Sequence, residues 1–462
     1  MAAAETVCQR DGVPFDRVLS LYDRACEADA PRAIVVPSPD ETFEALREDD
    51  VSWQSVLEAG EAAGNAARVT ADPYAITNVL FSSGTTGTPK ATLLTHRNLE
   101  FACYVENRHH QQTHDDNFLC IPPLYHTGAK MHWFGNFIVG AKGVILKGIK
   151  PEFILQAISE EKITIVWLLV PWAHDILIAI ENKEIDIADY ELDQWRLMHM
   201  GAQPIPPSLI NNWKKIFPHH EYDTNYGLTE STGPGCVHLG LENTAKVGAI
   251  GVPGFDWECH IVDFELQPLP QGEPGELLVR GPGVMKEYYK MPEETAATIT
   301  EDGWLLSGDI GEIDNQNFLR ITGRKKELII TAGGKNIAPA AIEGTIATSK
   351  YINQVFVIGD RRKFLSALVT LDEENVRAWA DEEGISYTGI DDLMANENVQ
   401  ALIDAEVAAK NTQFARFESI KKVTIVPEFT IANGLITPTL KVKKNVVAAH
   451  YEQEINQMYP VD

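Results

Sequence analysis

The sequence predicts an α/β protein with more than one domain. Short β-branched runs, such as AITNVLF, KGVILKG and VFVIGD, alternate with longer helical patterns such as PEFILQAISEE. From about Gly248 onward, short strands separated by Gly, Pro and Asn turns indicate a smaller β-rich region. The chain has 462 residues, of which 44% are apolar, so it has room for two or three domains.

These patterns place the elements in order along the chain. We expect layered α/β subdomains before Gly248 and the β-rich subdomain after it. The pattern of apolar and turn residues changes again near Arg324, where a mixed α+β stretch begins. We therefore expect a large N-terminal domain over residues 1–325 and a small, mobile C-terminal domain over residues 326–462.

The charge balance excludes some classes of partner. The chain carries 39 Lys and Arg against 66 Asp and Glu, a formal charge of -27, which repels phosphate backbones and argues against nucleic acid. The six cysteines have no paired spacing, the N-terminus has no signal-peptide pattern, and the longest apolar run, ITIVWLLVPWA, is too short to span a bilayer. We expect a cytoplasmic protein without an integral membrane segment. The sequence does not indicate its oligomeric state.

The stretch SSGTTGTPK, from Ser82 to Lys90, is rich in hydroxyl groups and glycine. Apolar NVLF before it and ATLL after it predict two strands, so the loop differs from a Walker A loop, which joins a strand to a helix. Its glycines can bring backbone N–H groups close to oxygen atoms, its hydroxyl groups can donate, and Lys90 adds a positive charge. A polyphosphate would suit such a loop, although the same residue types are common in ordinary turns.

Four further stretches follow in order: YDTNYGLTE, WLLSGDIGEID, ITGRKKELIITAGGKNIAP and NGLITPTLKVKK. Together with the loop, and over nearly the whole chain from about Ile76, they resemble the adenylate-forming superfamily, which includes acyl-CoA synthetases, luciferases and the adenylation domains of peptide synthetases. Each stretch alone is weak evidence, but five matches in one order are specific. The resemblance implies that the small C-terminal domain moves between two half-reactions.

The resemblance assigns a nucleotide site residue by residue. The loop would hold the β- and γ-phosphates of ATP through Ser82, Ser83, Gly84, Thr85, Thr86, Gly87 and Lys90. Tyr226, next to Gly227, would stack on adenine, and Thr229 would bind phosphate. Glu230 would hold Mg²⁺, which accepts a carboxylate together with phosphate oxygens. Asp309, at the end of a predicted strand, would accept both ribose hydroxyl groups.

Other segments supply further candidates. MGAQPIP resembles the segment that lines the adenine pocket, which makes candidates of Gly201, Ala202 and Gln203. Arg324 is a further candidate for contact with the nucleotide. His126 in PPLYHTGA matches a family histidine at the mouth of the acyl pocket, and a hydrogen-bonded structural histidine is the alternative. The segment HHQQTHDD follows a helical run, so we expect a solvated helix end there and no metal site.

The C-terminal assignments concern domain movement and the second chemical step. Lys326 matches the hinge position of the family, and Gly333 and Gly334 would line the tunnel for the thiol. Lys441 matches the lysine that meets negative charge during adenylate formation. Lys443 lies close by and is the alternative catalytic lysine.

The implied reaction is an AMP-forming acid–thiol ligation. A carboxylate attacks the α-phosphate of Mg·ATP, which gives acyl-adenylate and pyrophosphate, and a thiol then displaces AMP. Free coenzyme A is the simplest acceptor, and the C-terminal stretches look most like fatty acyl-CoA synthetases of the long-chain type. An aromatic or sterol-type acid is the alternative substrate. The loop begins at Ser82, earlier than in relatives, so the competing hypothesis is an inactive or partner-dependent nucleotide-binding remnant.

Overall fold

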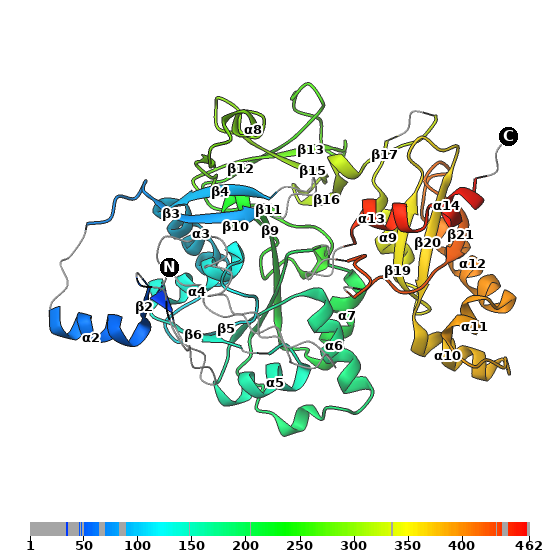
Figure 1. Cartoon of the computed structure of the whole chain (residues 1–462), viewed down its shortest axis with the longest axis horizontal. Helices are drawn as coiled ribbons and strands as arrows, with labels where there is room; N and C mark the ends of the chain where they lie inside the picture. The colour runs from blue at the N-terminus through cyan, green and yellow to red at the C-terminus, as the bar shows by residue number, and fades with distance from the viewer. Residues whose placement is uncertain are drawn as a thin grey trace. The chain divides into compact units, whose positions relative to one another are not determined.

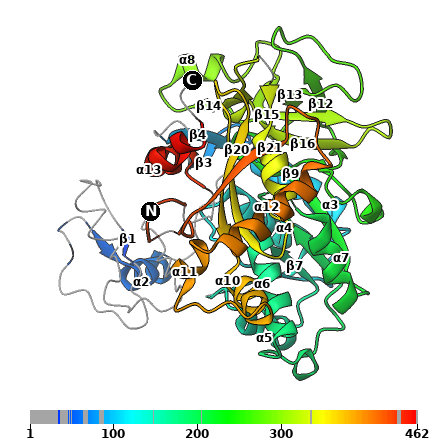
Figure 2. The same ribbon diagram turned by 90° about the vertical axis from the view of Figure 1, so that its right-hand side faces the viewer.

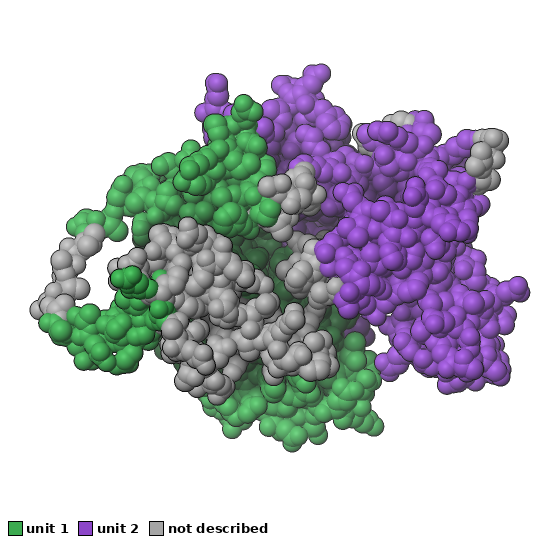
Figure 3. Space-filling view, in the orientation of Figure 1, with its two compact units in different colours: residues 1–203, 217–236, 282–295 green, residues 204–216, 237–281, 296–462 purple. Residues whose placement is uncertain are grey.

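The computed structural model describes residues 34–35, 46, 48, 50–63, 70–82, 89–146, 148–203, 205–333, 336–430, 432–436 and 442–459. The chain forms two compact units, which are coloured separately in Figure 3. The first unit comprises residues 1–203, 217–236 and 282–295, and the second comprises residues 204–216, 237–281 and 296–462. The predicted α/β class is confirmed (Figure 1), whereas a domain boundary after residue 325 stays a prediction.

The first unit contains a parallel sheet with the strand order β6-β5-β7-β8-β9. Its strands are β5 (Asn117–Cys120), β6 (Lys142–Ile145), β7 (Ile165–Leu168), β8 (Leu197–Met200) and β9 (Glu221–Leu228). The sequences of β7 and β8, IVWL and LMHM, are buried throughout, as expected for central strands of a parallel sheet. Because the strands run the same way, their carboxyl ends meet at one edge, where α/β sheets bind ligands.

Helices precede or connect these strands. They are α3 (His96–His109), α4 (Thr127–Val139), α5 (Pro151–Glu160) and α6 (Val170–Glu181), and α2 (Trp53–Ala63) precedes them. A capping box begins α3, because Thr95 Oγ1 accepts the N–H of Asn98 and Asn98 Oδ1 accepts the N–H of Thr95. Gly140, with φ +76°, ends α4 in the left-handed conformation. α3 packs against α4, and α5 packs against α6.

A small antiparallel sheet of the first unit carries the predicted phosphate loop. Its strand order is β14-β4-β3, with β3 (Ile76–Ser82), β4 (Lys90–Thr95) and β14 (Glu287–Tyr288). β3 and β4 pair antiparallel, with Ser82 opposite Lys90. The prediction that this loop joins two strands is therefore confirmed. A separate parallel pair consists of β1 (Ile34–Val35) and β2 (Val51–Ser52).

The second unit contains the β-rich region that the sequence indicates. A four-stranded antiparallel sheet has the order β12-β13-β15-β16. Its strands are β12 (Glu258–Val262), β13 (Gly275–Arg280), β15 (Leu305–Ile313) and β16 (Leu319–Arg324). The second unit also contains α7 (Pro207–Ile216) and β11 (Val252–Pro253), whereas β10 (Gly233–His238) and α8 (Pro292–Ala296) include residues of both units.

The C-terminal part of the second unit has a sheet with two apolar faces. Its order is β19-β20-β21, and Figure 2 shows β20 beside β21 with α12 against them. Val355 and Val357 pack in one core and Phe356 in the other, since side chains alternate along a strand. The strands and helices are β17 (Ile329–Ile330), β18 (Asn336–Ile337), β19 (Ile352–Ile358), β20 (Leu365–Leu371), β21 (Ile420–Ile425), α9 (Pro339–Ile346), α10 (Glu373–Glu382), α11 (Ile390–Met394), α12 (Glu397–Asn411), α13 (Lys444–His450) and α14 (Glu452–Gln457).

Membrane insertion finds no support among the described helices, since none combines the length and the apolar character that crossing a bilayer requires.

A buried histidine of the first unit makes the stability of the fold depend on pH. The ring of His220 stacks on Phe217 at 4.7 Å and lies 4.3 Å from the ring of Trp195. Burial, together with the nearby His219, lowers the pKa of His220 from 6.5 to about 4. The unfolded chain therefore binds the proton first as pH falls. The contribution of neutral His220 to the free energy of unfolding is fully present above pH 6.5, the pKa of histidine in the unfolded chain. It is lost as pH falls toward about 4, by roughly 3 kcal/mol.

We expect His220→Phe, which keeps an aromatic ring at this place, to flatten the pH dependence of unfolding in that window. Urea unfolding at a series of pH values measures it, with the exposed His114→Gln as the matched control. A His220→Phe chain that keeps the wild-type slope would show that another group is responsible.

Candidate active site

The phosphate-loop hairpin places Lys90 beside an aromatic ring of the same small sheet. Ser83, Gly84, Thr85, Thr86 and Gly87 lie outside the described residues, and so does the side chain of Ser82. Lys90 Nζ lies 4.6 Å from the centroid of the Tyr288 ring, at a distance typical of a cation–π contact. The lysine is thus held at the base of the loop by its neighbour on β14.

The predicted magnesium ligand, Glu230, contacts the same tyrosine. Glu230 lies in a single helical turn (Thr229–Ser231) directly after β9. Tyr288 Oη donates a hydrogen bond to Glu230 Oε1 at 2.7 Å, and the N–H of Met285 donates to the Glu230 carbonyl at 2.7 Å. Tyr288 therefore links Lys90 to Glu230. Sequence reasoning missed this residue, because its partner lies 58 positions away in the chain.

The turn that carries Thr229 and Glu230 is fixed by close contacts of small residues. Ser231 Oγ accepts the N–H of Leu228 at 2.8 Å and lies 3.2 Å from the carbonyl oxygen of Gly233, to which it can donate. Thr232 adopts a left-handed φ of +68°, and its hydroxyl donates to the Gly283 carbonyl at 2.5 Å. A rigid turn of this kind holds the carboxylate of Glu230 in one place.

Four other candidates lie at the carboxyl edge of the parallel sheet. Gly201 directly follows β8, and Tyr226 lies in β9, which pairs with β8 through Met200 and Thr224. A Cβ added to Gly201 would lie 3.3 Å from Asn225 Oδ1, so the segment passes close to β9. Ala202 has φ +68°, a left-handed conformation that turns the chain, and Gln203 follows it half-buried. This edge is where an adenine ring is expected.

His126 is the N-cap residue of α4. Its Nδ1 accepts the N–H of Gly128 at 3.2 Å, which makes Nε2 the protonated nitrogen of a neutral ring. The side chain is exposed, and its ring centroid lies 5.7 Å from that of Trp167. The ring therefore caps a helix, which supports the alternative of a structural histidine, and its place at the acyl pocket stays a prediction.

In the second unit, Asp309 pairs with Arg324 across two neighbouring strands. The two residues are opposite each other in β15 and β16, and Asp309 Oδ1 lies 2.9 Å from Arg324 Nε. Ser307 Oγ accepts the N–H of Asp309 at 3.0 Å. Asp309 lies in the middle of β15 and is 2% exposed, so the prediction that it ends a strand is wrong. Its role toward ribose stays a prediction.

The C-terminal candidates are described in part. Lys326 is exposed in a helical turn (Lys325–Glu327) after β16, and Gly333 is exposed in a turn. Gly334 and Lys441 lie outside the described residues. The neighbouring Lys444 forms ion pairs with Glu327 at 3.1 Å and with Glu343 at 3.3 Å, which distinguishes it from the exposed Lys443.

The segment HHQQTHDD departs from its prediction. It ends α3, as expected, and His114 and Asp115 are exposed. His110 is fully buried, however, and Asp116 is 5% exposed. Burial raises the pKa of Asp116, but Arg196, 2.9 Å from Asp116 Oδ1, and hydrogen bonds from Thr113 and Thr164 together outweigh burial and hold that pKa below its usual value. A solvated helix end is therefore wrong for these two residues, because later segments cover them.

Comparison with known families decides the classification. A sequence family described as AMP-binding enzyme matches residues 18–289. The chain belongs to the AMP-binding enzyme family. The AMP-binding enzyme C-terminal domain matches residues 326–461. The resemblance of the sequence motifs to adenylate-forming enzymes is thus confirmed.

Several curated relatives of this AMP-binding enzyme carry names that refer to long-chain fatty acids or long-chain acyl groups. The long-chain-fatty-acid–CoA ligase FadD15 of Mycobacterium tuberculosis is 38% identical over 236 residues, which cover 51% of this chain and 37% of that protein. The peroxisomal long chain acyl-CoA synthetase 7 of Arabidopsis thaliana is 29% identical over 439 residues, 84% of this chain and 61% of that protein. The chain therefore spans between about a third and two thirds of these relatives.

Solved structures share the fold of this AMP-binding enzyme. ATP-bound MatB from Rhodopseudomonas palustris has a TM-score of 0.69 at 24% identity, covering 87% of this chain and 74% of that chain. The O-succinylbenzoate coenzyme A synthetase MenE from Bacillus subtilis, in complex with ATP and magnesium ion, has a TM-score of 0.69 at 21% identity, covering 92% and 82%. At these identities the likeness establishes the fold alone.

Proposed function

We propose that this chain is an AMP-forming acyl-CoA synthetase that activates a long-chain fatty acid. The observation that carries the proposal is the contact of Tyr288 with both Lys90 and Glu230, because it joins a loop rich in phosphate-binding groups to a carboxylate suited to a cation. Family membership and the names of the curated relatives support it.

In the proposed first step, a carboxylate oxygen of the acid attacks the α-phosphorus of ATP. A new P–O bond forms, and the bond to pyrophosphate breaks. The phosphate loop and Lys90 hold the departing phosphates, Tyr226 and Gly201 border the adenine, and Asp309 accepts from ribose. In the second step, the sulfur of coenzyme A attacks the acyl carbon, so that a C–S bond forms, the C–O bond to AMP breaks and the thiol proton is released to solvent.

Glu230 fits a magnesium ion in its donor chemistry. Magnesium takes oxygen ligands and is commonly bound by one or two carboxylates together with phosphate oxygens. The hydrogen bond from Tyr288 to Oε1 orients the carboxylate, so that Oε2 is available to a cation. When bound, the ion would neutralise phosphate charge. Glu230 and Thr229 are the residues of this chain that would hold it with the nucleotide.

The test is to supply the chain with Mg·ATP, coenzyme A and a panel of carboxylic acids. Pyrophosphate release, AMP and acyl-CoA are measured, and hydroxylamine traps acyl-adenylate. We expect the highest turnover with long-chain fatty acids and lower turnover with medium-chain, aromatic and sterol-type acids. ADP and orthophosphate as products would overturn the proposal. A folded chain that binds ATP without turnover of any acid would favour the nucleotide-binding remnant.

We expect Tyr288→Phe to raise the Mg²⁺ concentration needed for half-maximal pyrophosphate release. The substitution keeps the ring under Lys90 and removes only the hydroxyl group that orients Glu230. Hydrogen bonds to charged groups are worth about 1.5–3 kcal/mol, so kcat/KM for Mg·ATP should fall roughly 10- to 150-fold.

The matched control for this prediction is Tyr289→Phe, at the neighbouring tyrosine, which is 50% exposed. Initial rates over a series of Mg²⁺ concentrations compare the two variants. Equal Mg²⁺ dependence in the two variants would show that Tyr288 does not orient a ligand of magnesium.

A further inference from the structure

A cluster of ionisable side chains is enclosed in the first unit, apart from the residues assigned to the nucleotide. We call it the histidine cluster, and its members are Glu106, His110, His132, His199 and Asp223. Each of them is 2% exposed or less. They come from α3 and the residue after it, from α4, and from β8 and β9. Enclosing five such groups together is costly unless they are hydrogen-bonded, neutralise one another or hold an ion, and neighbouring donors reach both carboxylates, from Asn225 to Glu106 and from Thr224 to Asp223.

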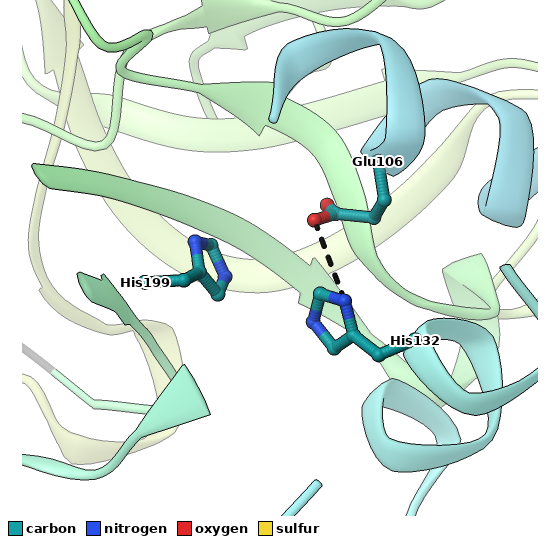
Figure 4. A group of neighbouring side chains, drawn as sticks. All are labelled: Glu106, His132 and His199. Carbon is teal, nitrogen blue, oxygen red and sulfur yellow. Dashed lines mark ion pairs between the residues drawn. The ribbon is translucent and has the colours of Figure 1, made fainter. Parts of the chain in front are cut away.

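Three members lie close enough together to be candidate metal ligands. Figure 4 shows Glu106, His132 and His199 pointing toward one another from three different elements. Glu106 Oε2 lies 3.9 Å from His132 Nδ1, and one ligand atom from each of the three residues lies within 4.8 Å of the other two. Zinc bonds to nitrogen and oxygen are about 2.0–2.2 Å long, which sets ligand atoms roughly 3–4 Å apart, so small side-chain movements complete the site.

The other two members lie around this group. His110 Nε2 is 3.0 Å from His199 Nδ1 and 3.9 Å from Asp223 Oδ2. A metal-bound imidazole generally hydrogen-bonds through its other ring nitrogen, which fixes the orientation of the ring. His110 stands in that relation to His199, so we assign His199 Nε2 to the metal.

Charge favours a divalent ion in this place. With neutral imidazoles and ionised carboxylates the cluster would carry a net charge of -2, which one divalent cation would neutralise. Two imidazole nitrogens and one carboxylate oxygen suit zinc and its neighbours, whereas magnesium and calcium take oxygen ligands. The histidine cluster therefore differs in chemistry from the proposed magnesium ligand Glu230.

We propose that Glu106, His132 and His199 bind a divalent transition-metal ion of the zinc class, with His110 as a positioning residue. The ion would join α3, α4 and β8. His199 lies two residues before Gly201, and α4 begins directly after His126, so the ion would stabilise the segments that carry these two candidates. The site requires neither ATP, acid nor coenzyme A, so its test is separate from that of the proposed function.

The experiment uses the full chain. Element analysis is made on protein purified without a metal-affinity step, then after treatment with a strong chelator, and again after addition of Zn²⁺. We expect about one zinc ion per chain, a lower melting temperature after chelation and recovery with Zn²⁺ but not with Mg²⁺. Co²⁺ added to the chelated protein should give visible d–d absorption, which reports coordination directly.

Variants assign the ligands. His132→Gln and His199→Gln should lose the Co²⁺ absorption, and His110→Gln should keep it with about 10- to 100-fold weaker Co²⁺ binding. The matched control is His220→Phe, which removes a buried histidine outside the cluster and should leave the absorption unchanged.

Two results would overturn the proposal. One is an unsubstituted chain that contains no transition metal and shows no absorption with Co²⁺, which decides the matter even where a variant fails to fold. The other is absorption that persists in a folded chain carrying both His132→Gln and His199→Gln. In the first case, imidazolium–carboxylate pairs would account for the enclosed charges.

Discussion

Replacing Gly227 with alanine should lower the rate of adenylate formation about 100-fold, since misplacing reacting groups by about 1 Å has effects of that size. A Cβ at this position would lie 1.8 Å from the carbonyl oxygen of Gly233 and 2.7 Å from the Cα of Pro234. Both are backbone atoms of β10, so one of the two strands must move. The segment that moves is the one that carries Tyr226 and Glu230 on either side of Gly227.

The same substitution should also lower stability by about 1–3 kcal/mol, as is usual when a packed site is overfilled. Thermal melts and the rate of acyl-adenylate trapping per folded chain separate the two effects. The matched control is Gly60→Ala in α2, where an added Cβ meets no atom within 4 Å. A folded Gly227→Ala chain with wild-type rates would show that the end of β9 does not position the reacting groups.

Much of the fold follows from local patterns of the sequence. Continuous apolar runs such as IVWL predict buried parallel strands, and two apolar runs around a Gly-rich stretch predict the hairpin of Ser82 and Lys90. The position of Asp309 was predicted less well. The apolar pattern stops before Asp309, but β15 continues to Ile313, because its pairing with β16 depends on backbone hydrogen bonds and not on apolar side chains.

The candidate site was predictable only where its residues lie within one motif. Tyr226, Thr229 and Glu230 stand in one short stretch, and the structure brings Thr229 and Glu230 onto one turn after β9. The contact of Tyr288 with Glu230 joins β14 to that turn, and nothing in either stretch indicates it. Long-range contacts of this kind depend on how separate elements pack, which a residue pattern does not record.

The histidine cluster is a second case in which packing brings together residues that no single stretch of sequence connects. His110 stands in a polar stretch that reads as a solvated helix end, whereas His132 and His199 stand in largely apolar stretches. The three meet only because α3 packs against α4 and because β8 is central in its sheet. Polar residues in a buried strand, such as His199 in LMHM, are the local signal that could have indicated it.

Lys441 and Gly334 should fail in opposite half-reactions. Lys441 is expected to meet negative charge only while the carboxylate attacks phosphate, so Lys441→Ala should slow adenylate formation about 10²- to 10³-fold. Thioester formation from supplied acyl-adenylate should survive. Gly334→Leu should do the reverse, because a side chain in the thiol tunnel would block coenzyme A, and acyl-adenylate should then accumulate.

The lysines near Lys441 provide the matched controls. Lys443→Ala removes an exposed charge close by and should leave both half-reactions near the wild-type rate, unless Lys443 is the catalytic lysine. Lys444 is engaged with Glu327 and Glu343, and burial raises the pKa of Glu343 while the Lys444 ammonium opposes that rise. Lys444→Ala should therefore lower the melting temperature and slow both half-reactions together.

Separate measurement of the two half-reactions, with thermal melts of every variant, decides between two explanations. If Lys441 and Gly334 act in different states of a moving C-terminal domain, each substitution impairs one step and leaves the melting temperature near that of the wild-type chain. If both residues only support packing, each substitution lowers both steps in proportion to the loss of folded protein, as Lys444→Ala is expected to do. Parallel losses in Lys441→Ala and Gly334→Leu would therefore exclude domain alternation as the way this chain separates its two chemical steps.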